Sequence, residues 1–259
     1  MNNRLSQLFG QKKRNVLSIF FTAGFPSVND TGGIARALEK AGADLIEIGI
    51  PFSDPIADGP VIQQSSKQAL DQGMNLKLLL EQVKQLRSGV TLPVVLMGYI
   101  NPILQYGIGN FCRDARAAGV DGVILPDLPL RDFNEHATLF HDNDLSVIML
   151  VTPATSDERI RLIDQTSSGF LYAVSASSTT GARVGFTAEQ EDYFRRLAGL
   201  GLRNPVLVGF GISNAATFQS ACRYGAGAIV GSAFVSMLGN STNLEDDITT
   251  FVKSIRSVS

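Results

Sequence analysis

The segment Ala41–Gly49, with the sequence AGADLIEIG, decides the fold class. Its first residues end a helical stretch at Gly42, and the residues after them form a short apolar run typical of a buried strand. Two later segments repeat the pattern, AGVDGVIL over Ala118–Leu125 and YGAGAIVG over Tyr224–Gly231. Each segment predicts a helix end, a glycine at the helix C-cap and a buried strand directly after it.

The same alternation runs through the whole chain. Stretches with helical spacing, such as Ile34–Lys40 and Leu76–Arg87, separate short apolar runs. The predicted strands are Leu17–Phe21, Leu45–Ile50, Val94–Met97, Gly122–Leu125, Ser146–Val151, Phe170–Val174, Pro205–Val208 and Ala228–Val230. Strand, helix and strand at this pitch indicate right-handed βαβ units in a parallel sheet that is buried on both faces.

These strands predict an α/β protein in which residues 1–259 form a single-domain (β/α)8 TIM barrel. The alternative, a doubly wound open sheet, usually has fewer strands. Within the barrel we expect a short N-terminal helix over residues 3–10, an active-site loop over residues 50–63 and a lid loop over residues 175–187. Connections as long as the last two are commonly functional in a compact domain.

Composition excludes several classes of protein. A formal net charge of −2 leaves no basic footprint for nucleic acid or an anionic membrane, and two cysteines form no disulfide framework or zinc cluster. Lys12–Phe21 resembles the start of a signal peptide, but Gly24–Pro26 interrupts it and a buried strand is the better interpretation. No apolar run reaches the roughly 18 to 20 residues of a membrane span, so we expect a cytoplasmic protein.

Carboxylates gather in the segment Glu47–Pro60, directly after a predicted strand. In a barrel the chemistry lies at the carboxyl ends of the strands. Glu47 interrupts an apolar run, so we expect it to point into the barrel near its mouth, where burial raises its pKa toward neutrality. Asp58 lies in a proline-stiffened loop and can hold a different protonation state. The alternative is a salt-bridged core Glu47, with Asp54 and Asp58 as turn formers.

Glycines follow the last two predicted strands, in Gly209–Ser213 and in Gly231–Ala233, and a helix is expected after each. Glycine lets the backbone approach an anion, and the free amides at a helix N-terminus bind it. Barrels often bind phosphate after their seventh and eighth strands. Neither cluster contains a basic residue, so the backbone itself would hold the phosphate.

The remaining candidates have weaker signals. Ser175–Gly185 is small and polar, as expected of a lid or of a plain flexible connection. Tyr172 either places a hydroxyl in the mouth or packs inside the barrel. His136 and His141 match no metal-ligand pattern, and the chain has no dinucleotide fingerprint, so we expect no metal, nicotinamide or flavin.

Several motifs resemble one known family, the α subunit of tryptophan synthase, over nearly the full chain. They are Phe21–Pro26, Leu45–Pro60, Leu96–Pro102, Leu125–Pro129, Thr180–Gly181, Gly209–Ser213 and Gly231–Ser232. The part from Glu47 to Pro60 is close to diagnostic, whereas many phosphate-binding barrels share the glycine clusters. The resemblance implies a lyase that cleaves indole-3-glycerol phosphate to indole and glyceraldehyde 3-phosphate in a retro-aldol reaction.

The resemblance also implies roles for individual residues. Glu47 matches the acid/base that protonates indole C3 and removes the side-chain hydroxyl proton. Asp58 matches the acceptor of the indole N–H, and Tyr172 matches a tyrosine close to the catalytic glutamate. The implied phosphate contacts are Gly181, Gly211, Gly231 and Ser232, and the implied walls of the indole pocket are Phe20, Tyr99, Leu125 and Phe210.

The family works as an α2β2 heterotetramer, whose β subunit uses pyridoxal phosphate to join indole with serine. The resemblance therefore implies a β-subunit partner and no cofactor in this chain. Asp54 and Thr180 match residues that couple the active-site loop and the lid to that partner. Residues 51–60 and 99–105 would face it. Ser178 stands where the lid usually has a glycine, which removes conformational freedom from the lid.

Two other functions stay open at this point. One is another phosphate-binding barrel, such as a sugar-phosphate isomerase or indole-glycerol-phosphate synthase, although the synthase would show lysines at strand ends. The other is a barrel that only binds and activates a β subunit. The presence of both Glu47 and Asp58 argues against this second alternative.

Overall fold

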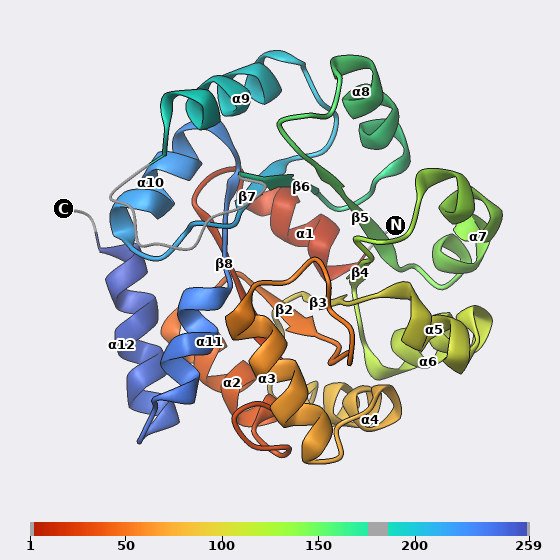
Figure 1. The fold of residues 1–259 in the computed structure, drawn as a ribbon, viewed down its shortest axis with the longest axis vertical. Coiled ribbons are helices and arrows are strands. Elements are labelled where there is room, and N and C mark those ends of the chain that lie inside the picture. The colour runs from red at the N-terminus through yellow and green to blue at the C-terminus, as the bar shows by residue number, and fades with distance from the viewer. Residues whose placement is uncertain (1–2, 176–185, 258–259) are drawn as a thin grey trace.

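The computed structural model describes residues 3–175 and 186–257. Within these ranges eight parallel strands pair in chain order, and β8 pairs with β1 to close the barrel. The strands are β1 (Val16–Thr22), β2 (Leu45–Gly49), β3 (Val94–Met97), β4 (Gly122–Ile124), β5 (Ser146–Val151), β6 (Leu171–Val174), β7 (Val206–Gly209) and β8 (Gly227–Val230). Helices surround them on the outside (Figure 1). The predicted (β/α)8 barrel is confirmed.

The helices alternate with the strands, with extra helices after β2, β3 and β8. They are α1 (Arg4–Gln11), α2 (Thr31–Ala41), α3 (Pro60–Asp71), α4 (Leu76–Leu86), α5 (Ile100–Tyr106), α6 (Ile108–Ala118), α7 (Leu130–Asp142), α8 (Asp157–Thr166), α9 (Ala188–Gly199), α10 (Ala215–Tyr224), α11 (Ser232–Gly239) and α12 (Leu244–Arg256). Among the helices of residues 3–175 and 186–257, none is long and apolar enough to cross a membrane.

The repeated glycine segments form the helix-to-strand junctions that their pattern predicts. Gly42 and Gly119 follow α2 and α6 in the left-handed region, with φ of 97° and 89°, which a glycine adopts without steric cost. Gly225 also follows its helix, but its φ is −123°. There the need for glycine is steric, because a Cβ would lie 2.7 Å from the Val206 carbonyl oxygen.

The ends of the strands differ from the predictions by about one residue. β1 extends the predicted Leu17–Phe21 at both ends, because Val16 pairs with Gly227 and Thr22 pairs with Gly49. β2 ends at Gly49 rather than at Ile50. The ladder of hydrogen bonds sets these ends, and the apolar pattern only approximates it.

The N-terminal helix α1 covers one end of the barrel. The ring centroids of Phe9 on α1 and Phe170 are 5.9 Å apart, and Asn3 Nδ2 donates to the Asp121 carbonyl oxygen at 2.9 Å. Phe170 and Asp121 directly precede β6 and β4, so α1 lies at the amino ends of the strands. The opposite end, where the strands finish, is the one that offers a site.

Candidate active site

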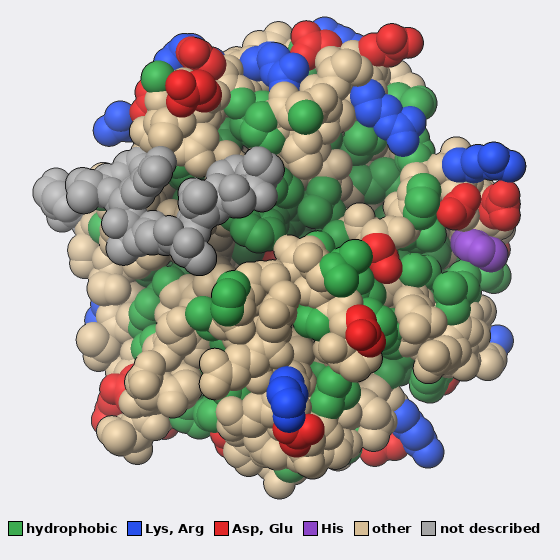
Figure 2. Space-filling model, viewed as in Figure 1, with side chains coloured by type: hydrophobic (Ala, Val, Ile, Leu, Met, Phe, Trp, Pro, Cys, Tyr) green, Lys and Arg blue, Asp and Glu red, His purple; other side chains and the backbone are tan. Residues whose placement is uncertain are grey.

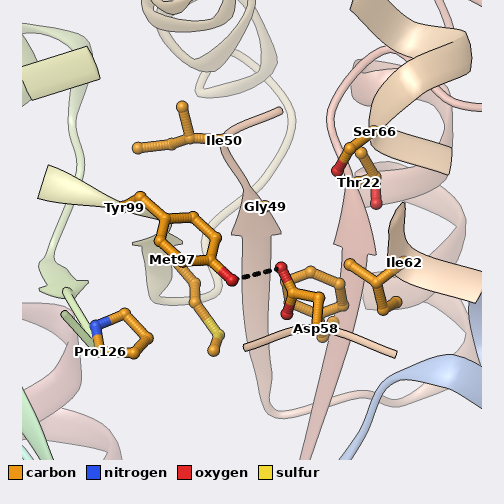
Figure 3. Close-up of a pocket in the computed structure, with 11 residues that line it drawn as sticks. Thr22, Gly49, Ile50, Asp58, Ile62, Ser66, Met97, Tyr99 and Pro126 are labelled. Carbon is orange, nitrogen blue, oxygen red and sulfur yellow. Dashed lines mark hydrogen bonds between the residues drawn. The ribbon is translucent and has the colours of Figure 1, made fainter. Parts of the chain in front are cut away.

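A cavity lies at the carboxyl ends of β1, β2 and β3. Its empty volume, which includes space open to solvent, is about 350 Å³. Its lining residues are Phe20, Thr22, Gly49, Ile50, Asp58, Ile62, Ser66, Met97, Gly98, Tyr99 and Pro126. Figure 2 shows the hollowed face over the barrel, where hydrophobic side chains gather. Figure 3 shows the Tyr99 and Asp58 side chains pointing toward each other across the cavity.

Glu47 lies on β2, two residues before the cavity residue Gly49, and its side chain is fully buried. It pairs in register with Phe20, which lines the cavity. Ser18 Oγ donates to Glu47 Oε1 at 2.7 Å, while Oε2 has no partner within the described residues. Burial raises the pKa of Glu47 to about 7, and the Ser18 hydrogen bond lowers it in part.

The alternative of a salt-bridged Glu47 does not hold for the described part of the chain, because no cation there lies within ion-pair distance of it. Glu47 is buried as expected, and that burial raises its pKa. A buried carboxyl group with a pKa near neutrality can give and take a proton at physiological pH.

Asp58 enters the same cavity from the loop between β2 and α3. The Tyr99 hydroxyl donates to Asp58 Oδ2 at 3.1 Å and accepts a hydrogen bond from the Ala57 amide at 2.9 Å. Gln63 Nε2 donates to the Asp58 carbonyl oxygen at 2.9 Å. Burial raises the pKa of Asp58, and the bond from Tyr99 lowers it in part. Tyr99, expected as a pocket wall, therefore also holds the loop.

Tyr172 lies on β6, buried beside the two carboxyl groups. Its pKa is raised well above the usual value, first by burial and then by the negative charges of Glu47 and Asp58. The position of its ring depends on Gly209, because a Cβ there would lie 2.2 Å from the Tyr172 hydroxyl oxygen. Of the three residues expected to be catalytic, Asp58 lines the cavity, and Tyr172 lies near enough to Glu47 and Asp58 for their charges to raise its pKa.

The predicted phosphate contacts lie at the ends of β7 and β8. Gly211 is exposed with φ of 76°, and Gly231 directly precedes α11, which begins at Ser232. Among the described residues no side chain caps the N-terminus of α11, whereas Asn214 and Thr217 cap α10. A Cβ on Gly231 would lie 3.7 Å from the Phe20 ring, so this helix start adjoins the cavity. Gly181 and Thr180, in the predicted lid, lie outside the described residues.

The other predicted pocket and loop residues lie apart from the cavity lining. Phe210 is 41% exposed, and its ring meets that of Tyr172 edge-on at 6.0 Å between centroids. Leu125 is buried, but its neighbour Pro126 lines the cavity in its place. Asp54 is exposed and accepts a hydrogen bond from Ser53 Oγ at 2.5 Å.

Sequence reasoning missed several residues of the site. Ser18 lies in the buried strand β1 with only apolar neighbours along Val16–Phe21, and that contrast was the available signal. Thr22, Met97 and Pro126 also line the cavity; the family motifs contain them, but the sequence reasoning gave them no role. In residues 3–175 and 186–257, no group of three or more His, Cys, Asp or Glu side chains is placed to hold a metal ion.

Comparison with known proteins agrees with this geometry. A family model described as tryptophan synthase alpha chain matches residues 6–258. The chain is 53% identical over 237 residues to the tryptophan synthase alpha chain of Phocaeicola vulgatus, covering 91% of this chain and 92% of that protein. It is 52% identical over 248 residues to that of Bacteroides fragilis, covering 95% and 94%.

Solved structures show the same likeness in three dimensions. The tryptophan synthase alpha chain of Legionella pneumophila superposes with a TM-score of 0.89 at 32% identity, covering 99% of this chain and 97% of that one. A chain of the tryptophan synthase complex from Pyrococcus furiosus has a TM-score of 0.87 at 35% identity, covering 95% and 100%. The family model and the relatives span nearly the whole sequence, so the chain belongs to the tryptophan synthase alpha chain family.

Proposed function

We propose that this chain is a lyase that cleaves indole-3-glycerol phosphate to indole and glyceraldehyde 3-phosphate, and that the indole passes to a β subunit for tryptophan synthesis. One observation carries the proposal. Glu47 is buried with a pKa of about 7 and one oxygen without a described partner, while the partly exposed Asp58 lines the adjoining cavity. Two carboxyl groups in such different environments suit an acid/base and a fixed anion.

The first step is protonation of the indole ring. Glu47 in its protonated form donates its proton to indole C3, which places a positive charge on the ring. Asp58 accepts a hydrogen bond from the indole N–H, and its negative charge stabilises that cationic intermediate. Tyr99 holds the Asp58 carboxylate in place through the 3.1 Å hydrogen bond.

The second step breaks the carbon–carbon bond. The Glu47 carboxylate removes the proton from the side-chain hydroxyl next to C3, and that oxygen forms the aldehyde carbonyl. The electron pair of the broken bond returns to the indole ring and cancels its positive charge. Glu47 ends protonated, as it began. Because the reaction begins with a protonated Glu47, kcat falls as pH rises through about 7.

The substrate phosphate binds, in this proposal, at Gly211, Gly231, Ser232 and Gly181. The uncapped N-terminus of α11 at Ser232 supports this placement, since its amides attract an anion. A Cβ on Gly49 in the cavity would lie 2.7 Å from the Phe20 ring, and one on Gly231 at that helix start 3.7 Å from it, so Phe20 lies near both. A single substrate can therefore place its indole near Asp58 and its phosphate at α11, with Phe20, Tyr99, Leu125 and Phe210 around the indole.

We also propose an α2β2 assembly with a tryptophan synthase β subunit, contacted through residues 51–60 and 99–105. Ile56 and Leu104 lie in these two segments with exposed fractions of 90% and 53%, as expected of side chains that a partner covers. Asp54 and Thr180 would couple loop and lid to the partner. Pyridoxal phosphate belongs to the β subunit in this proposal, and we expect no cofactor in this chain. We also expect residues 1–259 to form one domain and the protein to be cytoplasmic.

Release of indole from indole-3-glycerol phosphate tests the proposal, measured with the chain alone and with a β subunit. We expect turnover in both, and a loss of at least about a hundredfold in Glu47→Gln. Full turnover of Glu47→Gln would refute the acid/base assignment. If no indole is released with or without the β subunit, another phosphate-binding barrel, such as an isomerase, is favoured. If the chain activates a β subunit but releases no indole, a binding role alone is favoured.

A further inference from the structure

We propose that Ser18 is the positioning residue of the acid/base: it holds Glu47 Oε1 and thereby presents Oε2 to the substrate. This inference rests on the proposed function, because it assigns a role to the second oxygen of Glu47. Ser18 lies on β1, a strand from which the proposed function takes only the pocket residue Phe20.

The burial of Ser18 indicates that its hydrogen bond to Glu47 is specific. Its side chain is fully buried in β1, between Leu17 and Ile19, where a hydroxyl without a partner costs stability. That hydroxyl carries a single proton and donates it to Glu47 Oε1 at 2.7 Å. No other side chain within the described residues hydrogen-bonds to the Glu47 carboxyl group.

The direction of the contact follows from the register. Ser18 precedes the cavity residue Phe20 by two positions on β1, so it lies nearer the amino ends of the strands than the cavity does. Ser18 therefore contacts Oε1 from the amino ends of the strands, on the side of Glu47 that faces away from the substrate. Oε2 is buried and has no partner in the described part of the chain, although an unsatisfied carboxylate oxygen is costly. A bound substrate supplies the missing partner.

The same hydrogen bond serves both protonation states of Glu47. When Oε2 carries the proton, Oε1 accepts from Ser18 as a carbonyl oxygen, and when Oε2 has lost it, Oε1 accepts as a carboxylate oxygen. The bond is stronger to the charged form, so it lowers the pKa of Glu47 against the effect of burial. The other titratable groups near Glu47 are Tyr172 and Asp58, and the negative charges of Glu47 and Asp58 raise the pKa of Tyr172.

Variants of Ser18 test the inference. Ser18→Cys keeps nearly the same volume with a weak donor, and Ser18→Ala removes the donor. We expect kcat to fall by on the order of tenfold to a hundredfold in both, with little change in KM, and the alkaline limb of the kcat–pH profile to move to higher pH. Ser18→Thr keeps the hydroxyl and should recover most of kcat.

A control separates this role from packing. Ser167 is also a buried serine, and its single hydroxyl proton has the Val147 and Phe170 carbonyl oxygens as acceptors at 3.2 Å and 3.1 Å, away from the cavity. Ser167→Ala should lower thermal stability as Ser18→Ala does, without moving the pH profile. Unchanged kcat and pH profile in Ser18→Cys and Ser18→Ala, with Glu47→Gln inactive, would overturn the inference and leave the proposed function intact.

A second measurement does not depend on turnover. Carbon-13 NMR titration of the Glu47 carboxyl group should give a higher midpoint in Ser18→Ala than in the unaltered chain. An equal midpoint would overturn the inference, whether or not the protein releases indole. Failure of the unaltered chain to release indole, with the midpoint moved as expected, would instead refute the proposed function and keep the Ser18–Glu47 contact.

Discussion

Replacement of Glu47 by glutamine should stabilise the fold at alkaline pH while it removes activity. Burial raises the pKa of Glu47 from 4.5 to about 7, so the folded chain binds this proton more tightly than the unfolded chain does. The contribution of Glu47 to stability is therefore complete below pH 4.5 and is lost as pH rises through about 7. Above that pH the buried carboxylate is a net cost.

The size of the cost follows from the same two values. At about 1.4 kcal/mol for each pH unit between 4.5 and about 7, ionisation of Glu47 costs the folded state about 3 kcal/mol. Glutamine never ionises, and its amide oxygen can still accept the hydrogen bond from Ser18. Glu47→Gln should therefore be more stable than the unaltered chain by up to about 3 kcal/mol above neutral pH, and nearly equal to it in acid.

Urea unfolding of both proteins at about pH 5 and about pH 8.5 measures this difference. Glu135→Gln is the matched control, because Glu135 is exposed on α7 and its replacement removes the same charge from water. The control should show no comparable gain at the higher pH. Equal stability differences for Glu47→Gln at the two pH values, or a larger gain in acid, would refute the burial argument for this carboxyl group.

Three further substitutions probe the rest of the site. Asp58→Asn should lower kcat for indole release by at least about a hundredfold with the fold intact, because it removes the anion that stabilises the cationic indole ring. Retention of most turnover would contradict this role of Asp58. Gly209→Ala places a methyl group 2.2 Å from the Tyr172 hydroxyl oxygen, so melting curves should show a destabilisation of about 1–3 kcal/mol and kcat should fall; a neutral result would mean that Tyr172 moves freely. Ser232→Asp puts a carboxylate at the N-terminus of α11, which should leave helix stability unchanged or raised while KM rises at least about tenfold through repulsion of the phosphate. An unchanged KM would place the phosphate elsewhere.

The barrel was predictable because its signals are local. Apolar runs such as Leu45–Ile50 and the glycines that end α2 and α6 report burial and backbone conformation within a few residues of themselves. Glu47 was predictable for the same reason, since a charged residue inside an apolar strand must be buried in the barrel. The ends of the strands were less predictable. Strand β1 extends to Thr22 because Thr22 pairs with Gly49, and that pairing depends on the neighbouring strand.

The pocket walls were less predictable than the carboxyl groups. Resemblance assigned Leu125 and Phe210 to the indole pocket, whereas the structure lines the cavity with Pro126 and leaves Phe210 41% exposed. A wall residue is defined by the direction of its side chain relative to several strands, and the sequence of one strand does not contain that information. Their contact with indole stays a prediction.

The sequence by itself determined the order of the strands, the burial of Glu47 and the presence of Asp58 in the loop after β2, because each depends on neighbouring residues. Only the tertiary structure decided the contacts that make these groups usable. Ser18 and Glu47 are 29 positions apart, and Tyr99 and Asp58 are 41 apart. The register of β1 against β2 brings Ser18 within 2.7 Å of Glu47, and the loop after β2 brings Asp58 within 3.1 Å of Tyr99, which follows β3. Contacts between segments so far apart in the chain depend on strand register and loop placement, which no local pattern contains.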